Sequence, residues 1–172
     1  MELKILSCKG SSLLVTLLIL MIMSLFASAL VNMTIVHSRI AIADDYHQAA
    51  YYFAEAGLQH QLEVMANYME DLYRDDSIAN NRNDFYNSLV HLPIQVPSFQ
   101  PYKGQQVSLE ITKNYEGIWN DAIRFTIYSS CKVGNAKRIL KARLEILWRD
   151  PQTQEFHLNK SHFRISQYGE TY

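Results

Sequence analysis

The stretch KGSSLLVTLLILMIMSLFASAL, from Lys9 to Leu30, decides the fold of this chain, because formal charge ends at its first residue. The next charged side chain is Arg39, so the 26 residues from Ser11 to Val36 carry none. As an α-helix at about 1.5 Å per residue this run would extend roughly 39 Å, which exceeds the ~30 Å hydrocarbon core of a bilayer. The sequence therefore predicts a helix that can cross a membrane.

Three interpretations of this run differ in where the chain is cut. In the first, Ala27-Ser28-Ala29 is the small-x-small site of a secretory signal, and the protein is released after Ala29. In the second, the run is an uncleaved signal anchor. In the third, cleavage between Gly10 and Ser11 removes a short basic leader and keeps the helix. Positive charge before the run and acidic charge after it favour a cytoplasmic N-terminus and an exported C-terminus.

The sequence after the apolar run predicts that the helix continues. No Gly or Pro occurs between Ser11 and Ala56, and apolar or small residues then recur every three or four positions, which is the spacing of one helix face. A single helix could therefore run from near Ser11 to near Arg74. The predicted packing face includes small residues that let another backbone approach closely: Ala43, Ala50, Ala54 and Gly57.

Four short segments of alternating apolar residues follow and predict a β-rich head. They are residues 106–112, 122–129, 138–148 and 155–165, with turns expected at Gly117, Gly134-Asn135 and Asp150-Pro151. A polar loop is expected over residues 76–84 and a short helix over residues 84–92. Four strands joined by short connections suit an antiparallel meander, whose apolar face needs a cover. The predicted fold class is therefore α+β, with a long N-terminal helix packed by its small-residue face on a small antiparallel sheet.

Three features resemble, in this order and spacing, the N-terminus of type IV pilin-like proteins. They are KGSSLLVTLLILMIMSLFASAL, the unbroken helix after it and YYFAEAGLQHQL at residues 51–62. The resemblance is closest to the PilX-like minor pilins and minor pseudopilins, and it covers roughly residues 9–62. It implies cleavage between Gly10 and Ser11 by a prepilin peptidase, methylation of the new amino group of Ser11, and assembly of the apolar helices into a filament core.

The resemblance and the residue pattern together predict the domains and the partners. Residues 1–10 form a prepilin-type leader, residues 11–36 the transmembrane and filament-core helix, residues 37–75 its amphipathic continuation, and residues 76–172 an extracytoplasmic head. The implied partners are other pilin subunits, the prepilin peptidase, the inner-membrane assembly platform and, before assembly, membrane lipid. The predicted function is a minor structural subunit of a pilus or pseudopilus on the cell surface. The alternative is a signal-anchored extracytoplasmic binding domain that does not polymerise.

One position departs from the pattern of the family. Major pilins carry Glu at the fifth mature position, where it neutralises the terminal amine of an adjacent subunit, and the residue at this position here is Val15. An ammonium inside a bundle of apolar helices costs several kcal/mol unless a carboxylate meets it. Residues 11–36 contain no carboxylate at all. We therefore expect a subunit that is rare in the filament or sits at its tip.

Neither composition nor motifs predict catalysis, a metal or a cofactor. With 16 Lys and Arg against 17 Asp and Glu, bulk charge indicates no partner. Asp44 and His47 have the spacing of an ordinary solvated pair on a helix, and Cys131 has no identifiable base to activate it. Four aspartates flank a loop but lack the residue order and the Gly of a calcium site: Asp71, Asp75, Asp76 and Asp84.

A basic patch is predicted on the outward face of the third strand. Its members are Lys137, Lys141, Arg143 and Arg149. The simplest interpretation is a solvated strand face. The functional interpretation is a partner surface for an acidic neighbouring pilin, an anionic surface polymer, or DNA in an uptake pilus. No module for nucleic-acid recognition is visible in the sequence, so DNA is the least favoured of the three.

Overall fold

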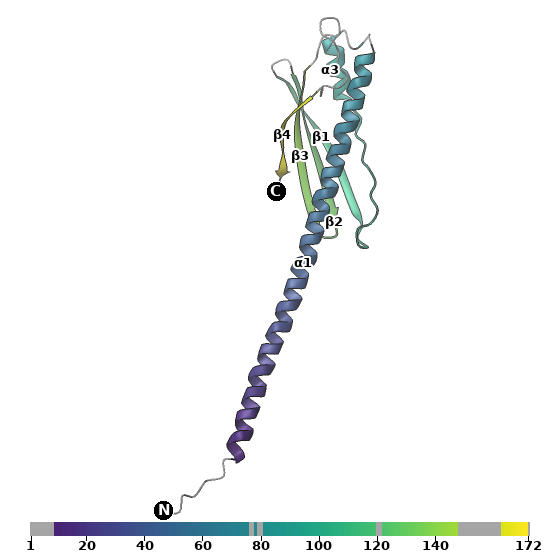
Figure 1. Cartoon of the computed structure of the whole chain (residues 1–172). Coiled ribbons are helices and arrows are strands. Elements are labelled where there is room, and N and C mark those ends of the chain that lie inside the picture. The colour runs from purple at the N-terminus through teal and green to yellow at the C-terminus, as the bar shows by residue number, and fades with distance from the viewer. Residues whose placement is uncertain (1–8, 76–77, 79–80, 120–121, 148–162, 172) are drawn as a thin grey trace, which may run out of the picture. The chain divides into compact units, whose positions relative to one another are not determined.

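The structure, a computed structural model, describes residues 9–75, 78, 81–119, 122–147 and 163–171 (Figure 1). Their elements are α1 (Lys9–Arg74), α3 (Arg82–Val90), β1 (Val107–Trp119), β2 (Ala122–Val133), β3 (Ala136–Leu147) and β4 (Phe163–Thr171). The chain divides into two compact units, residues 1–44 and 45–172. The predicted α+β fold class is confirmed, because α1 packs on a four-stranded antiparallel sheet.

Helix α1 is uninterrupted because its sequence contains no Pro. In the first unit its side chains are exposed from residue 12 to residue 44. Two threonines there satisfy their hydroxyls within the helix. Thr16 donates to the carbonyl oxygens of Ser12 and Leu13, and Thr34 donates to that of Leu30. These polar groups therefore need no partner outside the helix in an apolar environment.

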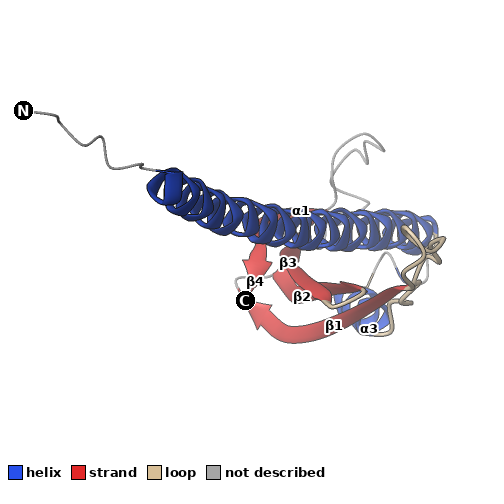
Figure 2. Cartoon of the chain, turned by 90° about the horizontal axis from the view of Figure 1, so that it is seen from below, coloured by secondary structure: helices blue, strands red, loops and turns tan. Residues whose placement is uncertain are grey.

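In the second unit α1 is amphipathic, and one of its faces forms the helix side of the core. Figure 2 shows this part of α1 lying along one face of the sheet. The buried residues run from small to large along the helix: Ala49, Ala50, Ala54, Gly57, Leu58, Gln61, Met65, Met69 and Leu72. A Cβ atom added at Gly57 would lie 2.7 Å from Cδ2 of Leu109 and 2.9 Å from Oγ of Ser129. The helix and the sheet therefore approach each other closely at this turn.

The sheet has the strand order β1-β2-β3-β4, and all its neighbouring strands are antiparallel. Strands β2 and β3 pair without a register shift from Ala122 opposite Leu147 to Val133 opposite Ala136. Alternate residues of these two strands are buried: Ile123, Phe125, Ile127, Leu140, Ala142, Leu144 and Ile146. The core of the second unit lies between this face and α1, with α3 contributing Phe85 and Leu89.

One predicted turn in the sheet is wrong. Gly117 does not end a strand, because it lies inside β1 with φ of 108° at a shift of register between Tyr115 and Gly117. The extra residue of this β-bulge is Glu116, which has no opposite residue on β2. Of the fourth strand predicted over residues 155–165, residues 163–165 lie in β4, which runs from Phe163 to Thr171. Residues 155–162, like Asp150-Pro151, lie outside the described residues.

The short helix and the loop before it also differ from expectation. Helix α3 begins at Arg82, before the expected start at Asp84, because Asn81 caps it. The side-chain oxygen of Asn81 accepts a hydrogen bond from the backbone N–H of Asn83 at 3.0 Å. Such a cap satisfies one of the free N–H groups of the first turn. Residues 82–84 of the polar loop predicted over residues 76–84 therefore belong to α3. Residues 76, 77, 79 and 80 lie outside the described residues.

The segment between α3 and β1, residues 91–106, is tied to α1 by one buried side chain. Gln61 is 1% exposed. Its Nε2 donates to the carbonyl oxygen of Pro93 at 2.9 Å, and its Oε1 accepts from the backbone N–H of Gln95 at 3.0 Å. One amide group thus pairs with the segment as a neighbouring strand would.

Candidate functional site

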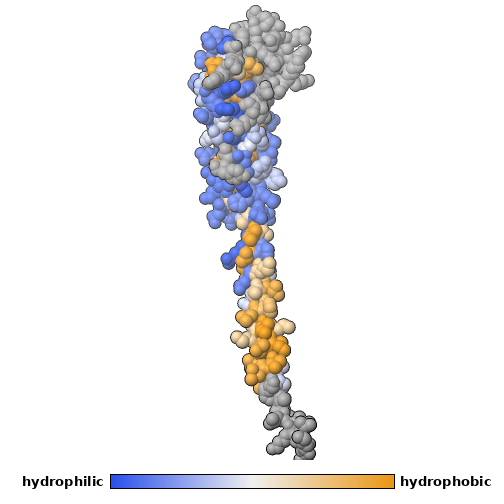
Figure 3. Space-filling model, turned by 90° about the vertical axis from the view of Figure 1, so that its left-hand side faces the viewer, coloured by the Kyte–Doolittle hydropathy of each residue, from blue (hydrophilic) through white to orange (hydrophobic). Residues whose placement is uncertain are grey.

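The N-terminal half of α1 is covered with apolar side chains (Figure 3). Leu13 is 70% exposed and Phe26 is 67% exposed, and the large side chains between them are exposed as well. By length and composition α1 can cross a membrane, and its most apolar window is not buried anywhere in the structure. This window is therefore not the core helix of a soluble domain. So large an apolar surface is stable only in lipid or among other apolar helices.

The residues of the predicted processing site lie at the start of this helix. Helix α1 begins at Lys9, so Gly10 and Ser11 are both helical. Val15 follows about one turn later and is 54% exposed. Cleavage at Gly10 and methylation at Ser11 remain predictions.

Three of the four small residues predicted to pack lie against the sheet. Ala50 and Ala54 are fully buried, and Gly57 meets Leu109 and Ser129 closely. Ala43 belongs to the first unit and is exposed. A role for Ala43 in packing against other subunits remains a prediction.

With this helix described, the comparison with known families can be stated. Residues 9–59 match the family model described as PilX N-terminal. This part of the chain is PilX-like. The match confirms the resemblance inferred from the sequence, and it supports a type IV pilin-like, membrane-anchored structural subunit. No curated protein and no solved structure is significantly similar to the chain.

Beyond the PilX-like region, the outward face of the sheet carries the predicted basic patch. Lys137, Lys141 and Arg143 alternate with the buried residues of β3 and so lie on the face away from α1. Arg149 lies outside the described residues.

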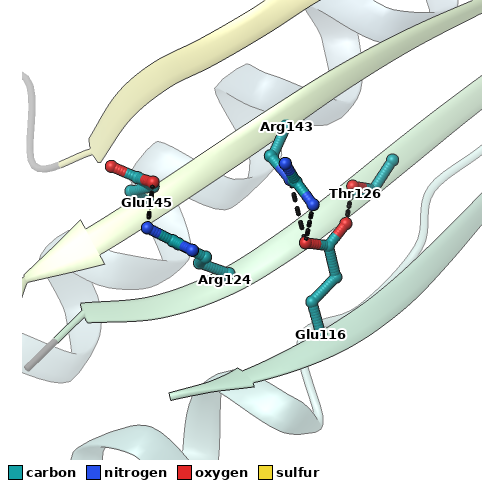
Figure 4. Close-up of polar contacts among 5 residues, drawn as sticks. All are labelled: Glu116, Arg124, Thr126, Arg143 and Glu145. Carbon is teal, nitrogen blue, oxygen red and sulfur yellow. Dashed lines mark hydrogen bonds and ion pairs between the residues drawn. The ribbon is translucent and has the colours of Figure 1, made fainter. Parts of the chain in front are cut away.

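Arg143 forms an ion pair with the carboxylate of the β-bulge (Figure 4). Its Nη2 and Nε donate to Oε2 of Glu116 at 2.6 and 2.8 Å, and Thr126 donates to the other carboxylate oxygen. The hydrogen bonds from Arg143 lower the pKa of Glu116 below its usual value, and Thr126 adds to this effect. Arg124 pairs with Glu145 at 2.9 Å on the same face. This end of the outward face is therefore close to electrically neutral.

Lys113 shows a polar contact that the sequence pattern did not reveal. It occupies an inward position of β1, between Ile111 and Tyr115, where the alternation predicts an apolar residue. Its Nζ donates to the carbonyl oxygens of Val90 and Leu92 at 2.7 and 3.0 Å. An ammonium group placed at the C-terminal end of a helix, here α3, stabilises carbonyl groups that lack partners within the helix. Burial lowers the pKa of Lys113.

A second such contact fixes a tight hairpin next to α1. Tyr102 and Gln105 exchange two backbone hydrogen bonds of 2.9 Å, and both central residues have positive φ, 48° at Lys103 and 77° at Gly104. Lys103 pairs with Asp45 at 2.8 Å, and Tyr102 donates to the same carboxylate at 3.2 Å. The hydrogen bond from Lys103 is the main cause of the lowered pKa of Asp45. The ion pair helps to hold Lys103 in a backbone conformation that residues other than glycine rarely adopt.

Cys131, for which the sequence offered no activating base, has surroundings that do not favour a nucleophile. Cys131 is fully buried in β2, and burial raises the pKa of its thiol to about 11. A thiol in this state is a poor nucleophile near neutral pH. Among the described residues, no group of three or more His, Cys, Asp or Glu side chains could hold a metal ion.

Proposed function

We propose that this protein is a minor subunit of a type IV pilus or pseudopilus, cleaved between Gly10 and Ser11 and methylated on the new amino group. The observation that carries the proposal is the exposed, charge-free stretch of α1 within a PilX-like region. An apolar helix surface without a cover in its own chain suits first lipid and then the equivalent helices of a filament core. The function is structural and not catalytic.

The membrane orientation follows from the charges that flank this stretch. Lys4 and Lys9 precede it, whereas residues 37–75 carry two basic and seven acidic groups. Positive charge is retained on the cytoplasmic side of a membrane. We therefore place the leader in the cytoplasm, where a prepilin peptidase and an inner-membrane assembly platform would act on it, and the head outside. Other pilin subunits would surround α1 after assembly.

Val15 is the reason for proposing a minor subunit. After cleavage the amine of Ser11 would lie in an apolar environment, and no residue from Ser11 to Val36 supplies a carboxylate to an adjacent copy. A buried charge without a partner is strongly unfavourable. A filament of consecutive copies of this chain would therefore bury one unpaired amine for each copy. This cost favours single copies, placed apart in the shaft or at the tip.

The mature N-terminus tests this proposal directly. We expect mass spectrometry of the protein purified from membranes and from sheared filaments to identify methylated Ser11 as the first residue. A chain that begins at Leu30 would mean that it is a secreted protein. A chain that keeps residues 1–10 would instead favour the signal-anchored domain that does not polymerise.

A further inference from the structure

Among the described residues, the lysines of the outward face differ from its arginines in having no ion-pair partner. Arg124 and Arg143 are matched by Glu145 and Glu116. Lys132 of β2 and Lys137 of β3 lie directly opposite each other near the turn at Gly134, and both are exposed. No carboxylate among the described residues pairs with either of them. Like charges at opposite positions destabilise a sheet, so these two lysines do not contribute to stability as a pair.

An open pocket adjoins this pair of lysines. The hairpin pocket has a volume of about 370 Å³ and is lined by Gln105, Gln106, Ser108, Lys132 and Gly134. Two amides, a hydroxyl and an ammonium supply hydrogen-bond donors, and none of the five residues carries a negative charge. Glu110 lies two residues from Ser108 on the same face of β1 but does not line the pocket. A lining with one ammonium and no carboxylate suits an anion.

One wall of the pocket is held in place by the hairpin of residues 102–105. The hairpin is closed by the two hydrogen bonds between Tyr102 and Gln105, and Asp45 anchors it through Lys103 and Tyr102. The backbone of Gln105 is thus positioned before any ligand arrives. Preorganised donors lose less conformational entropy on binding than free side chains do.

We propose that the hairpin pocket, together with Lys137, binds the carboxylate side chains of an acidic segment of a partner protein. A carboxylate between Lys132 and Lys137 would offset their mutual repulsion, and the amides and Ser108 would satisfy its remaining lone pairs. This surface is additional to the filament-core helix and does not depend on how the N-terminus is processed.

The arrangement of cations favours a polypeptide over a nucleic acid. A nucleic-acid strand is bound by cations that follow its backbone and by rings on which its bases stack. Here two lysines lie at one end of the sheet, and no aromatic residue lines the pocket. Lys141, four residues further along β3, lies roughly 13 Å from Lys137 at the spacing of a β-strand. One or two carboxylates fit this arrangement better than a row of phosphates.

The test measures binding of a fluorescein-labelled hexaglutamate peptide to the full-length protein in micelles of a non-ionic detergent. Fluorescence anisotropy at low salt should show saturable binding, and a hexaglutamine peptide should not bind. Lys132→Gln and Lys137→Gln should each weaken binding about two- to fivefold, because each removes one exposed charge pair. Lys141→Gln should have a smaller effect. Arg74→Gln, which lies at the far end of α1 from Asp45, should have none.

A charge reversal separates binding from stability. Lys137→Glu places a carboxylate opposite Lys132, so it should abolish peptide binding and raise the unfolding midpoint by about 1–4 °C. Three results would overturn the proposal. They are no binding of hexaglutamate, equal losses in the Lys141→Gln and Lys132→Gln variants, and tighter lysine-dependent binding of an oligothymidylate with the same charge.

Discussion

At Gly57 the helix backbone and the sheet leave no room for a side chain, because an added Cβ would lie within 3 Å of both Leu109 and Ser129. Ala54, one turn earlier, is fully buried by the same approach. Residue size on this face therefore sets how closely α1 and the sheet can pack. A substitution on this face tests the stability of the head, because every buried core residue that the structure describes belongs to residues 45–172.

We predict that Ala54→Leu destabilises the head by about 1–3 kcal/mol, the usual effect of adding carbons to a close contact. Gln59→Leu places the same side chain on the exposed face of α1 and should be nearly neutral. Thermal unfolding of a soluble fragment that begins at residue 39 measures both. Equal midpoints for the two variants would show that the close approach is not needed for stability.

The second prediction at the residue scale concerns pH and Glu116. Its pKa in the folded state lies below the ordinary value of 4.5, mainly because Arg143 donates hydrogen bonds to it. A depressed carboxylate pKa adds stability that is present above pH 4.5 and is lost as pH falls through the folded-state pKa. Glu116→Gln should therefore lower the unfolding midpoint more at pH 7 than at pH 3.

The matched control for this prediction is Glu63→Gln, which changes an exposed carboxylate of α1 that has no ion pair among the described contacts. Its midpoint should follow that of the wild type across the whole pH range. If the difference between Glu116→Gln and wild type is the same at pH 3 and pH 7, the ion pair with Arg143 is not its cause.

At the scale of elements, residues 91–106 lack regular structure and yet are fixed to α1. The hydrogen bonds of Gln61 hold the start of this segment, and the anchor at Asp45 holds its far end. Phe53 of α1 packs against Phe99 between them, with ring centroids 4.8 Å apart. A loop fixed at three points gives β1 and the hairpin pocket a defined position on the helix.

We predict that Gln61→Met, which keeps the length of the side chain, destabilises the head by about 1–3 kcal/mol because two backbone groups lose their partner. Hydrogen exchange at the N–H of Gln95 should accelerate more than exchange in β2. Gln59→Met changes an exposed residue of the same helix and should alter neither quantity. An unchanged exchange rate at Gln95 would contradict the proposed anchoring.

At the scale of the whole molecule, the chain combines a head with a complete core and a helical stretch that has no cover of its own. The buried residues lie at Ala49 and beyond, whereas the apolar side chains from Leu13 to Val36 are exposed. The head can fold by itself, whereas the exposed helical stretch requires lipid or other helices. This division supports a subunit whose assembly is governed by its N-terminal helix.

We predict that Val15→Glu increases the share of this subunit in sheared filaments. The new carboxylate could pair with the amine of Ser11 on an adjacent chain, which removes the unpaired charge that limits consecutive copies. Quantitative immunoblotting against the major subunit measures the share. Wild-type protein at a stoichiometry near that of the major subunit would refute the minor-subunit proposal. Val15→Gln is the matched control, because its polar side chain cannot supply the charge, and it should not raise the share.

The sequence alone determined the features that depend on local pattern. A charge-free run, followed by a three-to-four spacing without Pro, is sufficient to specify α1, because a helix closes its hydrogen bonds within the segment. The same spacing predicted the packing face of this helix, which includes Ala50, Ala54 and Gly57. Alternation of apolar residues located β1, β2 and β3, since the period of two fixes which side is buried.

Only the tertiary structure decided the features that depend on strand register. Glycine is common in turns, so the sequence predicted a turn at Gly117. Its position beside a β-bulge is set by the register in which β1 pairs with β2. The sequence predicted Arg143 as part of a basic patch, whereas the pairing of the strands places the carboxylate of Glu116 next to its guanidinium group. Lys132 and Lys137 face each other for the same reason. Hydrogen bonds between strands join residues distant in sequence, so no local pattern specifies which side chains will meet.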